Sequence, residues 1–351
     1  MHRRVSICVV GTVLGWLVLA PGAAAQNGDI PRTASGRPDL SGTYDVSTLT
    51  PMERPEELGE KMALSEEEAA EVAEGARRRD ERRAQPSDPN RGAPPQGGRV
   101  GGYNGFYIDN GDSAFQVDGQ WRTSILIDPP DGRYPPRVDG ARGRGGRTPN
   151  PGTAFWLEEG LDAPGPYDNM EQRPYAERCI LSFGSTSGPP MLPALYNNHK
   201  RIVQGEDTIL ILIEMVHDAR IIRMNAEHDP PEIRKWLGDS IGWWEGDTLV
   251  VETTNFVDRP AFRRGSRNMT VTERFRMESA DQLVYTFTVE DPTVWTASFT
   301  GEYAWPRSDN KVYEYACHEA NYALDGIMKG ARLLEAEFRG EEPDGVVNPT
   351  R

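Results

Sequence analysis

Along most of the chain after residue 120, apolar and polar residues alternate with a period of two in short runs separated by turn residues. In a β-strand this period places successive side chains on opposite faces of a sheet. Two of the separators, 205–207 and 245–247, are plausible hairpin loops. The predicted strands are 43–46, 121–127, 200–204, 208–216, 220–224, 241–244, 248–256, 270–278, 282–290, 294–303 and 311–317.

Because tight turns join most of these strands, the pattern predicts a mainly β protein. We expect an antiparallel up-and-down barrel or a curved sandwich. A single β-rich domain should span 103–341, with a flexible loop near 131–152 where Pro, Gly and Arg dominate. Residues 26–102 are predicted as an N-terminal arm and linker, and 342–351 as a tail.

Helical signals occur at three places. Ser65 and Glu68 form a capping box that predicts a charged N-terminal helix to about Arg83. Residues 231–237 are expected to form a short helix with Pro at its first turn. Residues 322–338 place apolar side chains on one face, which predicts a C-terminal helix that caps the sheet.

Residues 1–25 have the pattern of a cleavable signal peptide. A basic start precedes an apolar run over 7–20, and small residues follow at 23–25. The apolar run is shorter than the ~20 residues of a spanning helix. We therefore expect a periplasmic or secreted protein without a permanent membrane anchor, and the sequence leaves open whether export is Sec or twin-arginine dependent.

Charge and cysteine content refine this picture. The chain has 39 basic and 54 acidic residues, for a net charge of −15, and removing 1–25 leaves −17 because two arginines are lost. Such acidity argues against a nucleic-acid partner. Cys179 and Cys317 are the cysteines after residue 25, so a disulfide is expected in an oxidising compartment, with two separately buried thiols as the alternative.

Some carboxylates fall on strand faces that are otherwise apolar. Glu273 shares a face with Val271 and Phe275, and Glu214 shares a face with Leu210 and Leu212. A buried carboxylate needs a partner, and Arg220 and Arg223 are candidates. These residues could serve catalysis, or they could form Arg–Glu ladders inside a barrel.

Two segments combine histidine with acids. In 214–220, His217 lies between Glu214 and Arg220, a grouping that suits proton abstraction, although a surface turn has the same composition. In 313–322, His318 is followed by Glu319, but Tyr322 stands where a zinc-protease helix needs a second histidine. No metal or other cofactor is expected, and a plain disulfide staple is the alternative for this segment.

Tryptophans provide candidate binding surfaces. Trp243 and Trp244 are adjacent and must point to opposite faces of a strand. With Trp295 and Arg223 they are candidate substrate-binding residues, because aromatic platforms suit sugar rings and flat apolar ligands. Core packing is the competing interpretation of each tryptophan.

The motifs resemble those of an uncharacterised family of exported bacterial proteins. The resemblance covers roughly 178–332 and implies no activity. It rests on PPMLP at 189–193, EMVHDAR at 214–220, GWWEGDTLVVETTNF at 242–256, TVEDP at 288–292 and YEYACHEANY at 313–322, with PDLSG near 38.

Together these features predict an exported envelope enzyme that uses acid–base chemistry on a carbohydrate or another polar ring-containing substrate, with a lyase as one form. His217 is the expected base, Arg220 or Arg223 the charge neutraliser, and His318 or Tyr322 the acid. We expect His217, His318 and Arg220 to meet in one pocket with Glu214 or Glu273. The alternatives are a glycoside hydrolase using paired carboxylates, a lipocalin-like binding protein for a hydrophobic molecule, and a structural envelope protein. The oligomeric state is left open.

Overall fold

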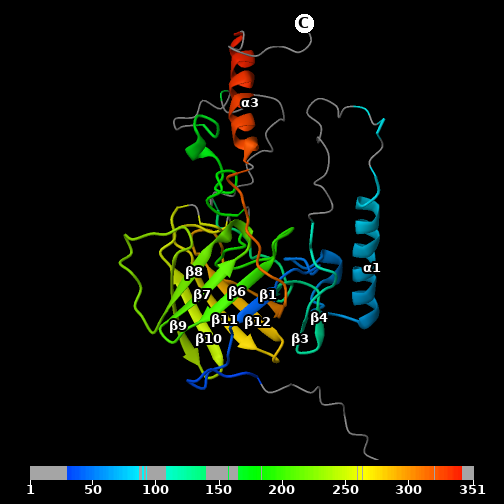
Figure 1. Ribbon diagram of the computed structural model, residues 1–351, viewed down its shortest axis with the longest axis vertical. Helices are drawn as coiled ribbons and strands as arrows, with labels where there is room; N and C mark the ends of the chain where they lie inside the picture. The colour runs from blue at the N-terminus through cyan, green and yellow to red at the C-terminus, as the bar shows by residue number, and fades with distance from the viewer. Residues whose placement is uncertain are drawn as a thin grey trace, which may run out of the picture.

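The computed structural model describes most of the chain between residues 30 and 341. The described residues are 30–86, 89–90, 92, 108–139, 157, 165–182, 184–258, 260–262, 264–319 and 321–341. The predicted signal peptide, the 342–351 tail and most of the loop predicted at 131–152 lie outside them. Within these ranges the protein is mainly β, as predicted, with one large curled sheet and one small sheet (Figure 1).

The large sheet contains ten strands in the order β1-β6-β7-β8-β9-β10-β11-β12-β13-β5. Each neighbouring pair is antiparallel except β8 and β9, which are parallel. The strands are β1 Gly42–Asp45, β5 Leu126–Asp128, β6 His199–Gln204, β7 Thr208–Ile213, β8 Ala219–Met224, β9 Asp239–Glu245, β10 Thr248–Thr254, β11 Thr270–Met277, β12 Gln282–Glu290 and β13 Phe299–Pro306.

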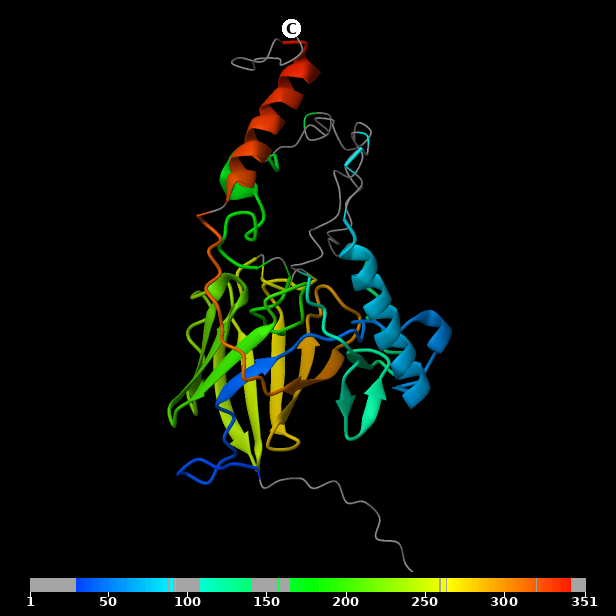
Figure 2. The same ribbon diagram turned by 45° about the vertical axis from the view of Figure 1, so that its right-hand side comes forward.

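The sheet curls into a half-barrel, in which β1, at one edge of the sheet, meets the end of β13. Tyr44 of β1 forms an isolated antiparallel bridge with Arg307, which follows β13. The Ser308 amide donates to the Thr43 carbonyl at 2.9 Å, and Arg307 Nη1 donates to the Ser41 carbonyl at 2.6 Å. These bonds tie together the two sides of the curled sheet (Figure 2).

Aromatic side chains fill much of the space that the sheet encloses. The alternation of β11 points Val271, Glu273, Phe275 and Met277 inward, and all four are buried. The Tyr285 ring lies 4.8 Å from the Trp305 ring and 5.1 Å from the Phe275 ring, measured between centroids. Rings at these separations pack directly against one another, so this part of the interior is a core.

A small second sheet carries the N-terminal helix. Its order is β2-β4-β3, with β2 Ala63–Leu64, β3 Gln116–Val117 and β4 Gln120–Arg122. Helix α1, Glu66–Arg83, begins at the predicted capping box, in which the Glu68 amide donates to Ser65 Oγ at 3.2 Å and the Ser65 amide donates to Glu68 Oε2 at 2.7 Å. The two bonds satisfy backbone donors that a helix start leaves open.

The C-terminal helix α3, Tyr322–Arg339, matches its predicted range but does not cap the sheet. It extends away from the strands in both views (Figures 1 and 2). Its buried Ala331 packs with Leu157 and Tyr167, and Arg332 Nη2 donates to the Tyr167 carbonyl at 2.5 Å. None of the described helices is both long and apolar enough to cross a bilayer.

Three predicted elements were wrong, because their backbone groups bond elsewhere. The 121–127 run is split between β4 and β5, which belong to different sheets. Residues 231–237 form turns, since the Lys235 amide and carbonyl bond to the backbone on either side of Phe256. Residues 311–317 are not a strand. In that segment the Tyr313 amide donates to the Glu214 side chain at 3.1 Å.

The predicted disulfide between Cys179 and Cys317 is present. It joins residues 138 positions apart, with a Cα–Cα distance of 5.7 Å. On one side is the 165–182 segment, and on the other is the 308–319 segment that leads from β13 towards α3. The Asn321 side chain, at the start of α3, adds a hydrogen bond to the Glu177 carbonyl at 2.8 Å, so the 165–182 segment is held to the C-terminal part of the chain at two points.

Candidate functional site

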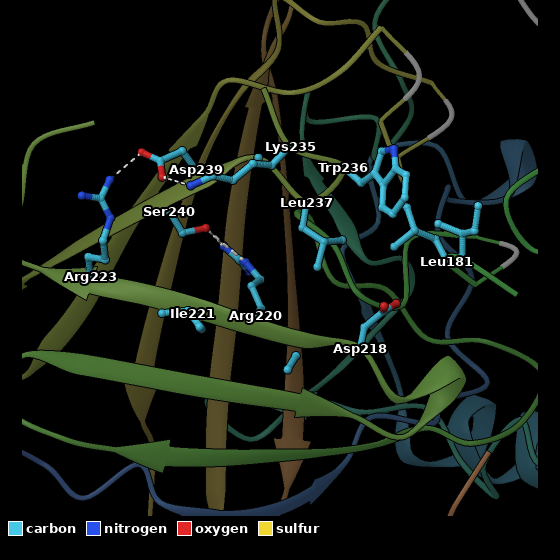
Figure 3. A pocket seen from close by; sticks show the side chains of 13 residues that line it. Leu181, Asp218, Arg220, Ile221, Arg223, Lys235, Trp236, Leu237, Asp239 and Ser240 are labelled. Atoms are coloured by element: carbon cyan, nitrogen blue, oxygen red, sulfur yellow. Dashed lines mark hydrogen bonds and ion pairs between the residues drawn. The ribbon is translucent and has the colours of Figure 1, made fainter. Parts of the chain in front are cut away.

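The parallel pair β8–β9 creates a pocket where the two strands separate. Their pairing begins at Ile222 and Ser240, so Ala219 to Ile221 extend beyond the start of β9. The chain before β9 turns towards Phe256 instead of following β8. The pocket that results has a volume of about 530 Å³ (Figure 3), and it is lined by Ile180, Leu181, Asp218, Ala219, Arg220, Ile221, Arg223, Lys235, Trp236, Leu237, Gly238, Asp239 and Ser240.

One end of this pocket combines a carboxyl group with apolar and aromatic side chains. Asp218, Leu181 and Trp236 lie together in Figure 3, and we call them the carboxyl–aromatic end. The Ser187 hydroxyl donates a short hydrogen bond to Asp218 Oδ2. Burial raises the pKa of Asp218 to about 6, although the hydrogen bond from Ser187 acts in the opposite direction. Near neutral pH this carboxyl group can therefore either accept or donate a proton.

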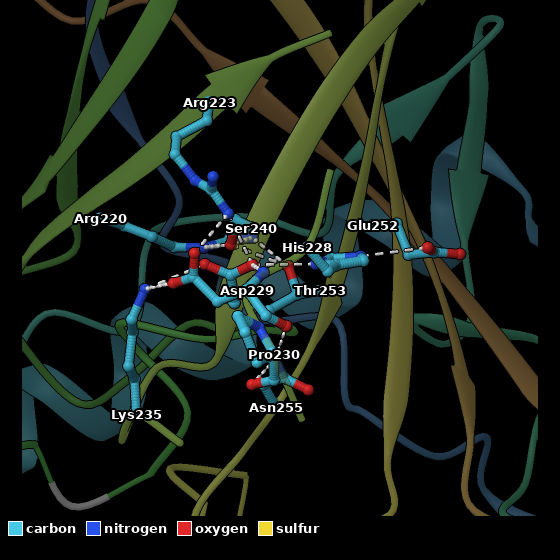
Figure 4. Close-up of polar contacts among 11 residues, drawn as sticks. Arg220, Arg223, His228, Asp229, Pro230, Lys235, Ser240, Glu252, Thr253 and Asn255 are labelled. Carbon is cyan, nitrogen blue, oxygen red and sulfur yellow. Dashed lines mark hydrogen bonds and ion pairs between the residues drawn. The ribbon is translucent and has the colours of Figure 1, made fainter. Parts of the chain in front are cut away.

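The other end is a network of paired charges, formed by Arg223, Lys235 and Asp239, which we call the charge-paired end (Figures 3 and 4). Asp239 is 2% exposed and accepts from Arg223 at 2.8 Å and from Lys235 at 2.9 Å. His228 Nδ1 lies 3.0 Å from Asp239 Oδ2, and the Asp229 amide donates to the same oxygen at 3.0 Å. Burial alone would raise the pKa of Asp239, but these hydrogen bonds outweigh it and hold the pKa well below its usual value.

Behind the pocket, Arg220 and Glu273 form an ion pair inside the barrel. The two side chains are 2% and 0% exposed, and Arg220 Nη1 donates to Glu273 Oε1 at 2.9 Å. Arg220 also donates to Ser240 Oγ at 3.1 Å and to Thr253 Oγ1 at 3.0 Å (Figure 4). The Tyr285 hydroxyl donates to Glu273 Oε1 at 2.6 Å. Polar residues of β8, β9, β10, β11 and β12 thus satisfy the buried charges.

A loop closes the barrel next to this ion pair. The Met191 amide donates to the Tyr285 hydroxyl at 2.9 Å, and the Tyr303 hydroxyl donates to the Met191 carbonyl at 2.8 Å. The same loop receives Lys200, which is 1% exposed and donates to the Thr186 carbonyl at 2.6 Å. Burial lowers the pKa of Lys200 to about 7, against the attraction of Asp218 and Glu214. The buried Lys200 amine is therefore bonded to Thr186, and the next residue, Ser187, donates to Asp218.

The histidine-centred pocket expected from the sequence is not assembled. His217 is exposed, and its Nδ1 lies 3.1 Å from the Tyr315 carbonyl. His318 is exposed, and Tyr322 is 84% exposed at the start of α3. No hydrogen bond or ion pair within the described ranges joins either histidine to Arg220. The 214–220 and 313–322 segments do meet, as expected, but through the Tyr315 carbonyl, which lies against His217, and the Tyr313 amide, which donates to Glu214.

The other predicted carboxylate, Glu214, belongs to a separate contact. Its Oε2 lies 3.2 Å from His199 Nδ1, and its Oε1 accepts from the Tyr313 amide. The hydrogen bond to Glu214 raises the pKa of His199. Glu214 and Glu273 each have their own partners and neither lines the pocket. The described geometry therefore does not present them as a pair facing a common substrate.

The candidate binding residues are also dispersed. Arg223 lines the pocket but is paired with Asp239. Trp295 is 4% exposed and stacks on Tyr134 with ring centroids 5.3 Å apart, so it belongs to the core. Trp243 and Trp244 are half-buried on β9 but are not among the residues lining the pocket. Arg37 lies over the Trp244 ring at 5.7 Å.

Sequence reasoning missed the pocket residues that matter most here. Asp218 lies in the 214–220 segment, where the sequence draws attention to His217 instead. The contacts that shield Asp218 come from Ser187 and the neighbourhood of Leu181, which follow no regular period. Trp236 and Lys235 lay in a predicted helix. One signal for the site was available in the sequence. Asp239 and Ser240 directly precede an apolar strand, and polar side chains that become buried in such a place need hydrogen-bonding or charged partners nearby.

The described residues contain no group of three or more His, Cys, Asp or Glu side chains arranged to hold a metal ion. Comparison of the chain with protein-family models, with curated proteins and with solved structures finds no significant match. The pocket at the β8–β9 junction is the candidate functional site.

Proposed function

We propose that the protein is an exported enzyme that acts by acid–base chemistry on a small ring-containing molecule bound in the β8–β9 pocket. Asp218 is the group that exchanges the proton. The observation that carries the proposal is the position of Asp218, a carboxyl group with a pKa raised to about 6 in a pocket with an apolar wall. Titratable groups perturbed in this way are concentrated at functional sites.

The proton transfer follows from the contacts of Asp218. In its ionised form the carboxylate takes a proton from an O–H, N–H or activated C–H of the substrate and becomes a neutral acid. The same acid then returns the proton to the product, which restores the starting state. The hydrogen bond from Ser187 fixes the orientation of the carboxyl group during both steps.

The size and lining of the pocket support a ring-containing substrate. Its volume of about 530 Å³ lies within the range of small-molecule sites. Trp236 is 46% exposed, and Leu237 lines the pocket beside it. The two side chains offer an aromatic and an aliphatic surface to a flat ring of the substrate. Export is supported by the Cys179–Cys317 disulfide, since such bonds persist in oxidising compartments.

A binding protein for a hydrophobic molecule is the second candidate, favoured by the same apolar wall. In this variant the ligand occupies the pocket outside the sheet, because the interior near Tyr285 is filled by rings. Binding without chemical change of the ligand distinguishes this candidate from the enzyme.

The test uses the full chain and a panel of cyclic sugars, amino sugars, cyclic amines, uronic acids, phenols and cyclic ketones in deuterated water. Proton NMR follows binding by line broadening, and reaction by loss of a C–H signal or appearance of a product. Asp218→Asn should lower any turnover by about 100-fold or more. Asp247→Asn, which removes an exposed carboxylate on the β9–β10 turn, is the matched control. Turnover that survives in Asp218→Asn contradicts the proposed role.

A further inference from the structure

We infer that the β8–β9 pocket selects a ring-bearing amine, an organic cation, over the corresponding ring carboxylate. This inference rests on the pocket of the proposed function and deepens it by naming the class of substrate. It follows from the charges around the pocket, which leave one carboxyl group, Asp218, without a cationic partner.

The cations that line the pocket are already neutralised by the protein. Arg220 pairs with Glu273 in the barrel interior. At the charge-paired end, Lys235 bonds to Asp239 at 2.9 Å and to Asp229 at 2.7 Å. Arg223 pairs with the same two carboxylates, at 2.8 Å and 3.3 Å. An anionic substrate would have to compete with these carboxylates for the cations. At Arg220 the competing pair is buried, and breaking a buried ion pair is costly.

Arg220 is the least available of these cations. Its guanidinium donates to Glu273, Ser240 and Thr253, and it is 2% exposed. Glu273 in turn accepts from Tyr285, so the whole set of donors and acceptors is satisfied internally. A substrate carboxylate would gain little from Arg220, because the charge of this guanidinium is already balanced at close range.

Asp218 forms no salt bridge within the described residues. Among the described side chains its polar contact is the hydrogen bond from Ser187, and it takes part in no ion pair. Its nearest basic neighbours have other contacts. Lys200 donates to the Thr186 carbonyl, and His217 lies against the Tyr315 carbonyl at the surface. Glu214, whose negative charge raises the pKa of Lys200, is bonded to His199. A ligand cation can therefore approach Asp218 directly.

Aromatic rings complete the carboxyl–aromatic end. Trp236 lines the pocket, and its ring lies 5.8 Å from the Tyr175 ring, measured between centroids. Figure 3 shows Trp236 and Asp218 on the same side, away from Arg223. An ammonium group is attracted to the face of an indole ring, so Trp236 and Asp218 favour the same charge. The net charge of −15 acts in the same direction at long range.

The test compares three probes of nearly equal shape: para-fluorobenzylamine, para-fluorobenzyl alcohol and para-fluorobenzoate. Fluorine NMR titration of the full chain gives a Kd for each probe. At about pH 8, where Asp218 is ionised, the amine should bind about 10-fold more tightly than the alcohol, as a charge-assisted hydrogen bond predicts. The benzoate should bind more weakly than the alcohol.

Two further arms isolate Asp218. In Asp218→Asn the advantage of the amine over the alcohol should disappear, while Asp247→Asn should keep it. In the unaltered protein the same advantage should fall several-fold by about pH 5, as Asp218 takes up a proton. This arm needs no variant to fold.

The outcomes separate this inference from the proposed function. Equal or tighter binding of the benzoate overturns the inference, as does an amine advantage that survives in Asp218→Asn. If the alcohol binds and the amine binds no more tightly than the alcohol, the inference fails while the proposed pocket stands. If none of the three probes binds, both the inference and the proposed pocket fail.

Discussion

The Arg220 guanidinium of β8 and the Glu273 carboxylate of β11 meet inside the barrel, although β9 and β10 separate their strands in the sheet. The ion pair therefore spans the curved interior and holds together strands that are not neighbours. Its position fixes the back of the pocket, since Arg220 also contacts Ser240 at the start of β9.

Replacing Glu273 should cost far more stability than replacing an exposed carboxylate. Glu273→Gln leaves the buried Arg220 charge without its partner, and we expect a loss of about 3–5 kcal/mol in urea unfolding. The control is Glu245→Gln on the exposed Arg274–Glu245 pair, where the side chains are 45% and 49% exposed. That change should cost far less stability, because an exposed ion pair is screened by solvent. Similar losses for the two variants would contradict the interior role of Glu273.

Asp218→Asn should stabilise the protein at neutral pH. The folded pKa of Asp218 is raised to about 6, so folding disfavours its ionised form above that pH. The variant removes this penalty, and we expect it to gain about 1–3 kcal/mol at pH 7. The gain should shrink as the pH falls through 6 and vanish below about 4, where the acid is neutral in both states. Thermal unfolding of both proteins from about pH 4 to 8 measures the difference; a gain that is independent of pH would count against a half-buried Asp218 that titrates in this range.

Lys200 should lower the pKa of Asp218. Its positive charge favours the carboxylate, so Lys200→Met should raise the pKa of Asp218 above about 6. Carbon-detected NMR of the Asp218 carboxyl group follows this titration directly. Lys200→Gln keeps a donor for the Thr186 carbonyl but removes the charge, and it should shift the pKa in the same direction. If the pKa of Asp218 shifts in Lys200→Met but not in Lys200→Gln, the effect comes from the lost hydrogen bond to the Thr186 carbonyl and not from the lost charge.

Loss of the disulfide should loosen the wall of the pocket before it unfolds the barrel. In Cys179→Ser/Cys317→Ser the 165–182 segment, which provides Ile180 and Leu181, loses its covalent tie to the 308–319 segment. For a closed loop of this length the chain-entropy model gives at most about 5 kcal/mol of stabilisation. Hydrogen exchange should increase at 175–182, while β11 and β12 remain protected. An equal increase in hydrogen exchange at 175–182, β11 and β12 would contradict this prediction, because it would show that the disulfide stabilises the whole sheet.

The sequence was sufficient for much of the fold, because strand alternation records which side faces the core. The period of two on β11 predicted that Glu273 shares a buried face with Phe275, and this is confirmed. The capping box at Ser65 and the Cys179–Cys317 bond are likewise local or compositional signals, and both are confirmed.

The pocket could not be predicted in the same way, because irregular segments form it. The burial of Asp218 depends on Ser187 and Leu181, 31 and 37 positions earlier, and Trp236 reaches the site through a turn. No periodicity specifies such contacts. His217 was more conspicuous in the sequence, yet its backbone has a positive φ of 48° and its ring lies at the surface.

The single parallel pairing between β8 and β9 divides the described sheet into two meanders. One contains β6 to β8 and the other β9 to β13, and within each the strands pair with their sequence neighbours. The 225–238 connection lies between them and supplies Lys235, Trp236 and Leu237 to the pocket. Much of this connection can change in sequence without removing a strand partner, provided that Lys235 keeps its backbone bonds near Phe256. The lining of the pocket can therefore be altered by substitutions in this connection while both meanders keep their strand pairing.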